Sequence, residues 1–131
     1  MPEKYKILFV CLGNICRSPA AEGVMRRLAE TQGLSERLEI DSAGTYGGHR
    51  GELPDLRMRS AAAKRGMGLT HRSRKIEEED FAEFDRIVVM DDMNYEDVHR
   101  LAPSREAAER IDRMREFFRK HPDRSHVPGP Y

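Results

Sequence analysis

Residues 6–18 read Lys6-Ile7-Leu8-Phe9-Val10-Cys11-Leu12-Gly13-Asn14-Ile15-Cys16-Arg17-Ser18 and place a thiol and a guanidinium at the two ends of one short loop. The first five residues are nearly all apolar and predict a buried strand, whereas Pro19-Ala20-Ala21-Glu22 opens a helix-forming segment. A loop between a strand end and a helix N-terminus gathers backbone N–H groups and the positive end of the helix dipole. The loop 11–18 is therefore suited to a bound dianion and to a thiolate.

Individual residues of this loop fit the same geometry. Gly13 permits backbone conformations that a side chain would block, and Asn14 tolerates left-handed dihedral angles. Ser18 followed by Pro19 is typical of an N-cap and a first helical position. The alternative interpretation is a structural turn around a buried free cysteine, as in many intracellular proteins.

The composition indicates one soluble domain that spans residues 1–131. Lys plus Arg and Asp plus Glu both number 23, so no charge bias points to nucleic acid or to a membrane surface. No apolar run reaches membrane-spanning length, and the first five residues lack the apolar centre of a signal peptide. Both cysteines lie in the loop, which fits a reducing compartment, so we expect a cytoplasmic protein.

Strands and helices alternate along the chain and predict an α/β fold with a parallel sheet. The expected strands are 6–10, 38–40 and 86–90, and the expected helices are 20–32, 55–64 and 106–120. In the first helix Val24, Leu28 and Ala29 form the apolar positions, and the acidic run 77–80 is interpreted as a solvated helix start. Ligands bind such sheets beyond the strand C-terminal ends, where Cys11, Ser42 and Asp91 fall.

Residues 10–19 resemble the phosphate-binding loop of the low-molecular-weight protein tyrosine phosphatases. Further matches follow in family order at 41–45, 53–55, 70–74, 89–94 and 127–131. The resemblance implies a three-layer α/β sandwich whose central, mostly parallel sheet has four strands, including a short one near 111–114 in place of a helix there. The sequence ends at Tyr131, before the position of the family's closing helix, so we expect the fold to lack that helix.

The resemblance also implies the roles of the loop residues. Cys11 attacks the phosphorus and forms a cysteinyl-phosphate, Arg17 clamps two equatorial oxygens, and Ser18 hydrogen-bonds the leaving sulfur. A bidentate arginine and a ring of amides stabilise the transferring phosphoryl group without a metal or cofactor, so we expect neither. The expected phosphate-binding residues are Leu12, Gly13, Asn14, Ile15, Cys16 and Arg17. A reversible disulfide between Cys16 and Cys11 protects the nucleophile.

By the same resemblance, Asn14, Ser42 and His71 join Ser18 in a hydrogen-bond network, and Asp91 lies close to it. Taken alone, His71 fits an ordinary surface histidine and Ser42 a plain turn residue. The family carries a bulky aromatic where Gly48 stands here, which leaves Tyr46, His49 and Tyr131 as candidates to flank an aryl phosphate.

One departure from the family lies near the C-terminal end. The family places its general acid, an Asp, between two prolines, and this sequence has Gly129 in Pro128-Gly129-Pro130. The tyrosine side chain, as the leaving group, has a pKa near 10, so loss of the proton donor costs roughly a hundredfold to ten-thousandfold in rate. Asp123 is the nearest carboxylate in sequence, six residues away.

Three functions remain open. The first is a phosphotyrosine phosphatase that is impaired at proton donation. Its expected partners are phosphotyrosine-containing proteins, a tyrosine kinase among them, and inorganic phosphate. Ile15 favours phosphotyrosine over phosphoarginine, because related arginine phosphatases carry Thr there. The second is a non-catalytic phosphate-binding or substrate-trapping protein, which Gly129 favours. The third, a thioredoxin-coupled arsenate reductase, needs downstream cysteines, and none follows Cys16.

Overall fold

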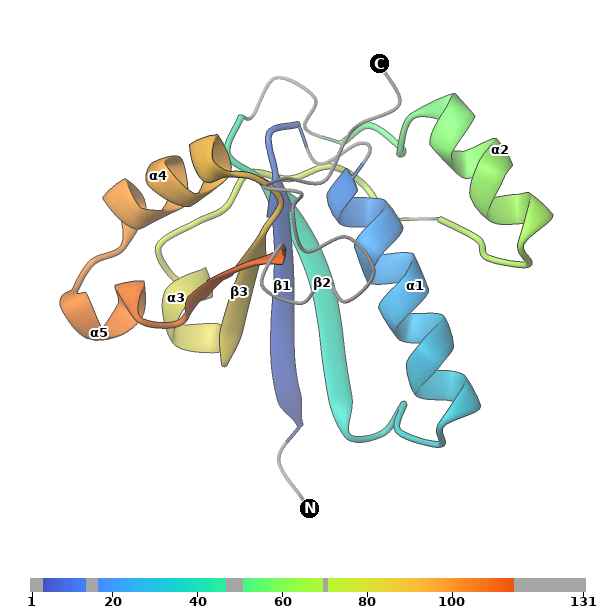
Figure 1. The fold of residues 1–131 in the computed structure, drawn as a ribbon, viewed down its shortest axis with the longest axis horizontal. Coiled ribbons are helices and arrows are strands. Elements are labelled where there is room, and N and C mark those ends of the chain that lie inside the picture. Colours follow the sequence, from blue (N-terminus) through green and yellow to red (C-terminus); the bar gives the residue numbers. More distant parts are fainter. Residues whose placement is uncertain (1–3, 14–16, 47–50, 70, 115–131) are drawn as a thin grey trace.

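A parallel sheet forms the centre of the computed structural model, which describes residues 4–13, 17–46, 51–69 and 71–114 (Figure 1). In this part of the chain the strands lie in the order β2-β1-β3-β4. Their bounds are β1 (Tyr5–Cys11), β2 (Leu38–Gly44), β3 (Arg86–Val89) and β4 (Ile111–Arg113). Every pairing between neighbouring strands is parallel, as the alternation of strands and helices predicted.

Helices cover both faces of the sheet and complete the three layers that were expected (Figure 1). The helices are α1 (Arg17–Thr31), α2 (Leu56–Lys64), α3 (Asp80–Glu83), α4 (Asp92–Leu101) and α5 (Arg105–Ala108). Helix α1 packs on one face, α3, α4 and α5 pack on the other, and α2 lies beyond α1 at the side of the molecule. None of the helices in the described part is long and apolar enough to cross a bilayer.

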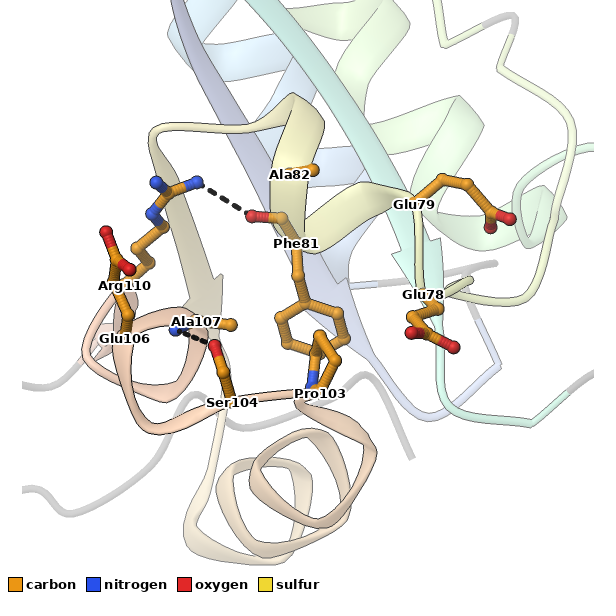
Figure 2. A pocket seen from close by; sticks show the side chains of 9 residues that line it. All are labelled: Glu78, Glu79, Phe81, Ala82, Pro103, Ser104, Glu106, Ala107 and Arg110. Atoms are coloured by element: carbon orange, nitrogen blue, oxygen red, sulfur yellow. Dashed lines mark hydrogen bonds between the residues drawn. The ribbon is translucent and has the colours of Figure 1, made fainter.

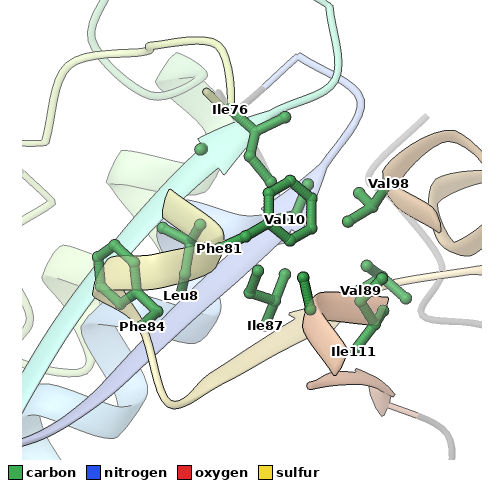
Figure 3. Packing of buried hydrophobic residues seen from close by; sticks show 11 residues of the cluster. Leu8, Val10, Ile76, Phe81, Phe84, Ile87, Val89, Val98 and Ile111 are labelled. Carbon is green, nitrogen blue, oxygen red and sulfur yellow. The ribbon is translucent and has the colours of Figure 1, made fainter. Parts of the chain in front are cut away.

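The side chains of β1 alternate between the two cores, which decides where the cysteine points. Leu8 and Val10 join the core under α3, α4 and α5, where Ile87 and Val89 of β3 meet them (Figure 3). Phe9 and Cys11 join the core under α1. Because successive residues of a strand face opposite sides of the sheet, the thiol lies on the same side as the helix that follows the loop.

Most element boundaries follow local signals, but α1 begins at Arg17, so Ser18 lies inside its first turn and is not the N-cap that the sequence predicted. The helix expected at 55–64 is confirmed as α2, whose N-cap is Asp55, and Gly66 with a φ of 77° follows its end. β2 extends past the expected 38–40 to Gly44 because it pairs with β1 along its whole length. In α1, Ala29 is buried, but Val24 and Leu28 are exposed, so the predicted apolar face is only partly correct.

The helix expected at 106–120 is wrong in the part that the structure describes. α5 ends at Ala108, and Ile111–Arg113 forms β4, which pairs with β3 and buries Ile111 in the core. Charge spacing favoured a helix, but the hydrogen bonds to β3 and the burial of Ile111 outweigh a weak local propensity. The strand that the family resemblance placed near 111–114 is confirmed, and residues 115–120 lie outside the described part.

The acidic run 77–80 does contain the start of α3, but its last residue is not solvated. Asp80 is 7% exposed, and its carboxylate pairs with both terminal nitrogens of Arg74, at 3.0 and 3.1 Å. Arg74 also reaches Asp41, whose Oδ2 lies 3.2 Å from Nη2. This bidentate pair offsets the cost of removing the Asp80 carboxylate from water and ties α3 to the edge of β2.

The partners of Asp41 lower the pKa of its carboxyl group. Burial on its own raises the pKa of Asp41, but hydrogen bonds from His71 and from the Ser42 amide, together with the Arg74 guanidinium, lower the pKa below its ordinary value. A carboxyl with a lowered folded-state pKa stabilises the fold above its unfolded pKa and loses this contribution as pH falls.

We predict that Asp41→Asn flattens the acid limb of the stability curve. The unfolding free energy of the unmodified chain should fall more steeply than that of the variant as pH drops from about 5 to about 2. Urea unfolding at a series of pH values measures both, with the exposed Glu78→Gln as the control that follows the unmodified chain. Parallel acid limbs for Asp41→Asn and the unmodified chain would contradict the prediction.

Candidate active site

The C-terminal ends of β1, β2 and β3 meet at one edge of the sheet and bring the predicted residues together. Cys11 ends β1, Ser42 lies near the end of β2, and Asp91 follows β3. Strand order reverses at β1, because β2 lies on one side of it and β3 on the other. Such a switch point leaves a crevice beyond the strand ends, where ligands of open parallel sheets bind.

Cys11 and Ser18 are in contact across the loop. The Cys11 Sγ lies 3.0 Å from the Ser18 Oγ, and the two residues are 3% and 0% exposed. The Ser18 hydroxyl also lies 3.4 Å from the carbonyl oxygen of Ala43, to which it can donate. A hydroxyl that rotates between a sulfur and a carbonyl can donate to the sulfur when it is a thiolate.

Arg17 is held by Asp91, which has a separate partner for each oxygen. Asp91 Oδ2 accepts a hydrogen bond from Arg17 Nη1 at 3.0 Å, and Oδ1 accepts one from the Asn94 amide at 2.7 Å. The second bond makes Asp91 the N-cap of α4. The carboxylate thus fixes one guanidinium nitrogen beside the loop, and the pair is mostly shielded from water.

Ser42 and His71 meet at Glu22, a residue that the sequence analysis did not select. The Ser42 hydroxyl lies 2.6 Å from Glu22 Oε1, and His71 Nδ1 lies 3.6 Å from the same oxygen and 3.2 Å from Asp41. Glu22 is buried in α1, one helical turn after Ser18. The i, i+4 spacing from Ser18 was the available signal, since it places both side chains on one face of the helix.

Glu22, Asp41 and His71 also place one ligand atom each within 4.8 Å of one another, as a metal site would. Both carboxylates have arginine partners outside the cluster: Glu22 pairs with Arg26 at 2.9 Å, and Asp41 pairs with Arg74. These contacts account for the cluster as a hydrogen-bond network, so we assign it no metal.

Tyr46, a predicted substrate-flanking residue, and Leu12 are exposed and paired through their main chains. The Tyr46 amide donates to the Leu12 carbonyl oxygen at 2.8 Å, and the two residues are 53% and 50% exposed. Several other predicted site residues lie outside the described part of the chain, namely Asn14, Ile15, Cys16, His49, Gly129 and Tyr131.

Cys11 lines neither of two pockets in the described part of the chain. A surface pocket of about 490 Å³ between α3 and α5 contains none of the predicted site residues (Figure 2). A smaller pocket of about 210 Å³ is lined by Glu22 and His71, together with Pro19 and Leu69. The smaller pocket therefore adjoins the network that supports the loop.

Comparison with known proteins agrees with this geometry. The family model described as "Low molecular weight phosphotyrosine protein phosphatase" matches residues 6–131. A low molecular weight phosphotyrosine protein phosphatase of Homo sapiens is 49% identical over 94 residues, which cover 72% of this chain and 60% of that protein. A low molecular weight protein-tyrosine-phosphatase of Streptomyces coelicolor is 41% identical over 113 residues, which cover 86% of this chain and 69% of that protein.

A solved structure shares the fold. The crystal structure of a protein tyrosine phosphatase from Entamoeba histolytica, with Hepes in its active site, superimposes with a TM-score of 0.93. It is 41% identical, and the alignment covers 98% of this chain and 81% of that one. The match of residues 6–131 and the shared parallel sheet lead to one conclusion. The chain belongs to the low molecular weight phosphotyrosine protein phosphatase family.

Proposed function

We propose that this chain, acting as one domain, hydrolyses phosphotyrosine in proteins through a cysteinyl-phosphate on Cys11. The observation that carries the proposal is the contact of 3.0 Å between the Cys11 sulfur, at one end of the loop, and the Ser18 hydroxyl at the other end, next to Arg17. A thiol, a hydroxyl donor and a guanidinium around one loop form a set suited to attack on a phosphate dianion.

The proposed reaction has two steps that share the same groups. In the first, the Cys11 thiolate attacks phosphorus, an S–P bond forms, and the P–O bond to the phenol breaks. In the second, water attacks phosphorus and the S–P bond breaks, which releases inorganic phosphate and restores the thiolate. Arg17 and the loop residues 12–17 stabilise the charge on the equatorial oxygens, and Ser18 donates to the departing sulfur.

The remaining residues act through these groups. Asp91 holds Arg17 in place, while Ser42 and His71 act through Glu22, which shares α1 with Ser18. Tyr46, His49 and Tyr131 flank the aryl ring of the substrate. A reduced Cys11 is required throughout, which agrees with a cytoplasmic location.

Gly129 sets the expected limit on catalysis. The first step releases a phenolate that needs a proton, and Gly129 stands where the family resemblance places the acid. The second candidate function follows from the same residue: a protein that binds phosphotyrosine tightly and turns it over slowly.

We predict that the chain hydrolyses p-nitrophenyl phosphate at least about a hundredfold faster, in kcat/KM, than a phosphotyrosine peptide, because nitrophenolate leaves without a proton. Steady-state rates on both substrates measure this, with Cys11→Ser as the background. Gly129→Asp should raise the rate on the peptide selectively. Comparable rates on both substrates would reveal another proton donor. Peptide binding with no turnover of either substrate would favour the phosphotyrosine-binding protein.

We also predict that Asp91→Asn lowers kcat/KM on p-nitrophenyl phosphate by about tenfold to a hundredfold. Asparagine keeps the cap on α4 but loses the charge that holds Arg17. The matched control is Asp92→Asn at the next position, where the exposed carboxylate pairs with Arg113 at 3.0 Å. An Asp91→Asn variant as active as the Asp92→Asn control would contradict the role of Asp91.

A further inference from the structure

Three successive carbonyl oxygens at the start of the loop accept hydrogen bonds from outside it. The Cys11 carbonyl accepts from the Thr45 amide at 3.0 Å, and the Leu12 carbonyl accepts from the Tyr46 amide at 2.8 Å. The Gly13 carbonyl accepts from the Ser73 hydroxyl, also at 2.8 Å. Of these three bonds, the third alone comes from a side chain.

Main-chain hydrogen bonds hold the backbone of Ser73 and of the residue that follows it. The Ser73 amide donates to the Glu52 carbonyl and its own carbonyl accepts from the Gly51 amide, both at 2.7 Å. One residue later, the Arg74 carbonyl accepts from the Gly44 amide at the end of β2, at 2.8 Å. Ser73 is 3% exposed. The paired main chain therefore keeps Ser73 beside the loop, with its hydroxyl within reach of the Gly13 carbonyl.

We propose that Ser73 is a positioning residue for the phosphate-binding loop, an inference that rests on the proposed function. In a trans peptide group the N–H points opposite to the C=O, so a carbonyl held from outside turns the N–H of its own peptide group the other way. The bond from Ser73 thus orients the peptide group that begins at the Gly13 carbonyl. Without this donor the group is free to rotate, and a carbonyl turned toward a dianion repels it.

The residue was not selected as functional from the sequence, because serine in a loop usually caps a turn or contacts solvent. The structure gives it a different environment: Ser73 is buried against the loop, on the segment that also carries His71 and Arg74. That segment runs beside the end of β2, where Lys75 forms a parallel bridge with Gly44. Ser73 thereby connects the loop to the same segment that contacts Glu22 and Asp41.

The test measures phosphate affinity without relying on turnover. Iodoacetate alkylates Cys11, and inorganic phosphate protects it, so the concentration that halves the alkylation rate reports phosphate binding; Cys11→Ser gives the background. We expect Ser73→Ala to raise this concentration about tenfold, less than the loss of a whole oxyanion donor. We expect a similar fall in kcat/KM on p-nitrophenyl phosphate.

Two controls separate positioning from stability. Ser104→Ala removes another serine hydroxyl, the N-cap of α5, which accepts from the Ala107 amide at 3.1 Å on the far face of the sheet (Figure 2). We expect Ser104→Ala to lower the urea midpoint and leave phosphate protection within twofold of the unmodified chain. The isosteric pair Ser73→Thr and Ser73→Val differs only in the hydroxyl, so threonine should restore affinity and valine should not.

The outcomes distinguish this inference from the function on which it rests. If phosphate fails to protect Cys11 in the unmodified chain, the proposed function is wrong. If phosphate protects the unmodified chain and Ser73→Ala equally, or Ser73→Thr and Ser73→Val equally, the positioning role of Ser73 is wrong. The threonine and valine pair decides the question even if Ser73→Ala does not fold.

Discussion

The contact between the Cys11 sulfur and the Ser18 hydroxyl holds together the two ends of the loop from which the proposed chemistry follows. β1 fixes one end, because β2 and β3 pair with it on both sides. The packing of α1 on the same face of the sheet fixes the other end. A shift of one residue in the register of β1 would turn the thiol to the opposite core. The pairing of β1 with its neighbours therefore decides where the thiol lies.

Three sets of side-chain contacts support the loop around this contact. Asp91 links Arg17 to the start of α4, Glu22 links α1 to Ser42 and His71, and the segment 71–76 links the loop to the edge of β2. Each link is a hydrogen bond or ion pair that a charged or polar side chain makes between two segments of the chain. Such support is what a site needs if it is to hold a dianion without rearrangement.

Local sequence signals predicted the parts of the fold that depend on local structure. The apolar run before Cys11, the helix after it and the strand at 86–90 were all visible, because burial and helix propensity act within a few residues. Cys11, Arg17 and Ser18 were identifiable for the same reason, since they share one loop. The expected strand ends placed Ser42 and Asp91 near Cys11, and the family resemblance added His71 and the expected hydrogen-bond network.

Long-range contacts decided the rest. The strand β4 exists because β3 offers it hydrogen bonds and a buried position for Ile111, which charge spacing does not reveal. Asp80 is buried because Arg74 reaches it, and Glu22 and Ser73 matter because of partners 20 and 60 residues away. Polar residues of this kind look like solvated surface in the sequence until the fold provides their partners.

The central claim is that Cys11 carries the phosphoryl group, and mass spectrometry of an acid-quenched reaction with p-nitrophenyl phosphate tests it most directly. The account predicts that the peptide containing Cys11 gains the mass of one phosphoryl group during turnover, and that Cys11→Ser abolishes turnover. Steady hydrolysis by Cys11→Ser at the rate of the unmodified chain, with no phosphoryl group on that peptide, would contradict it.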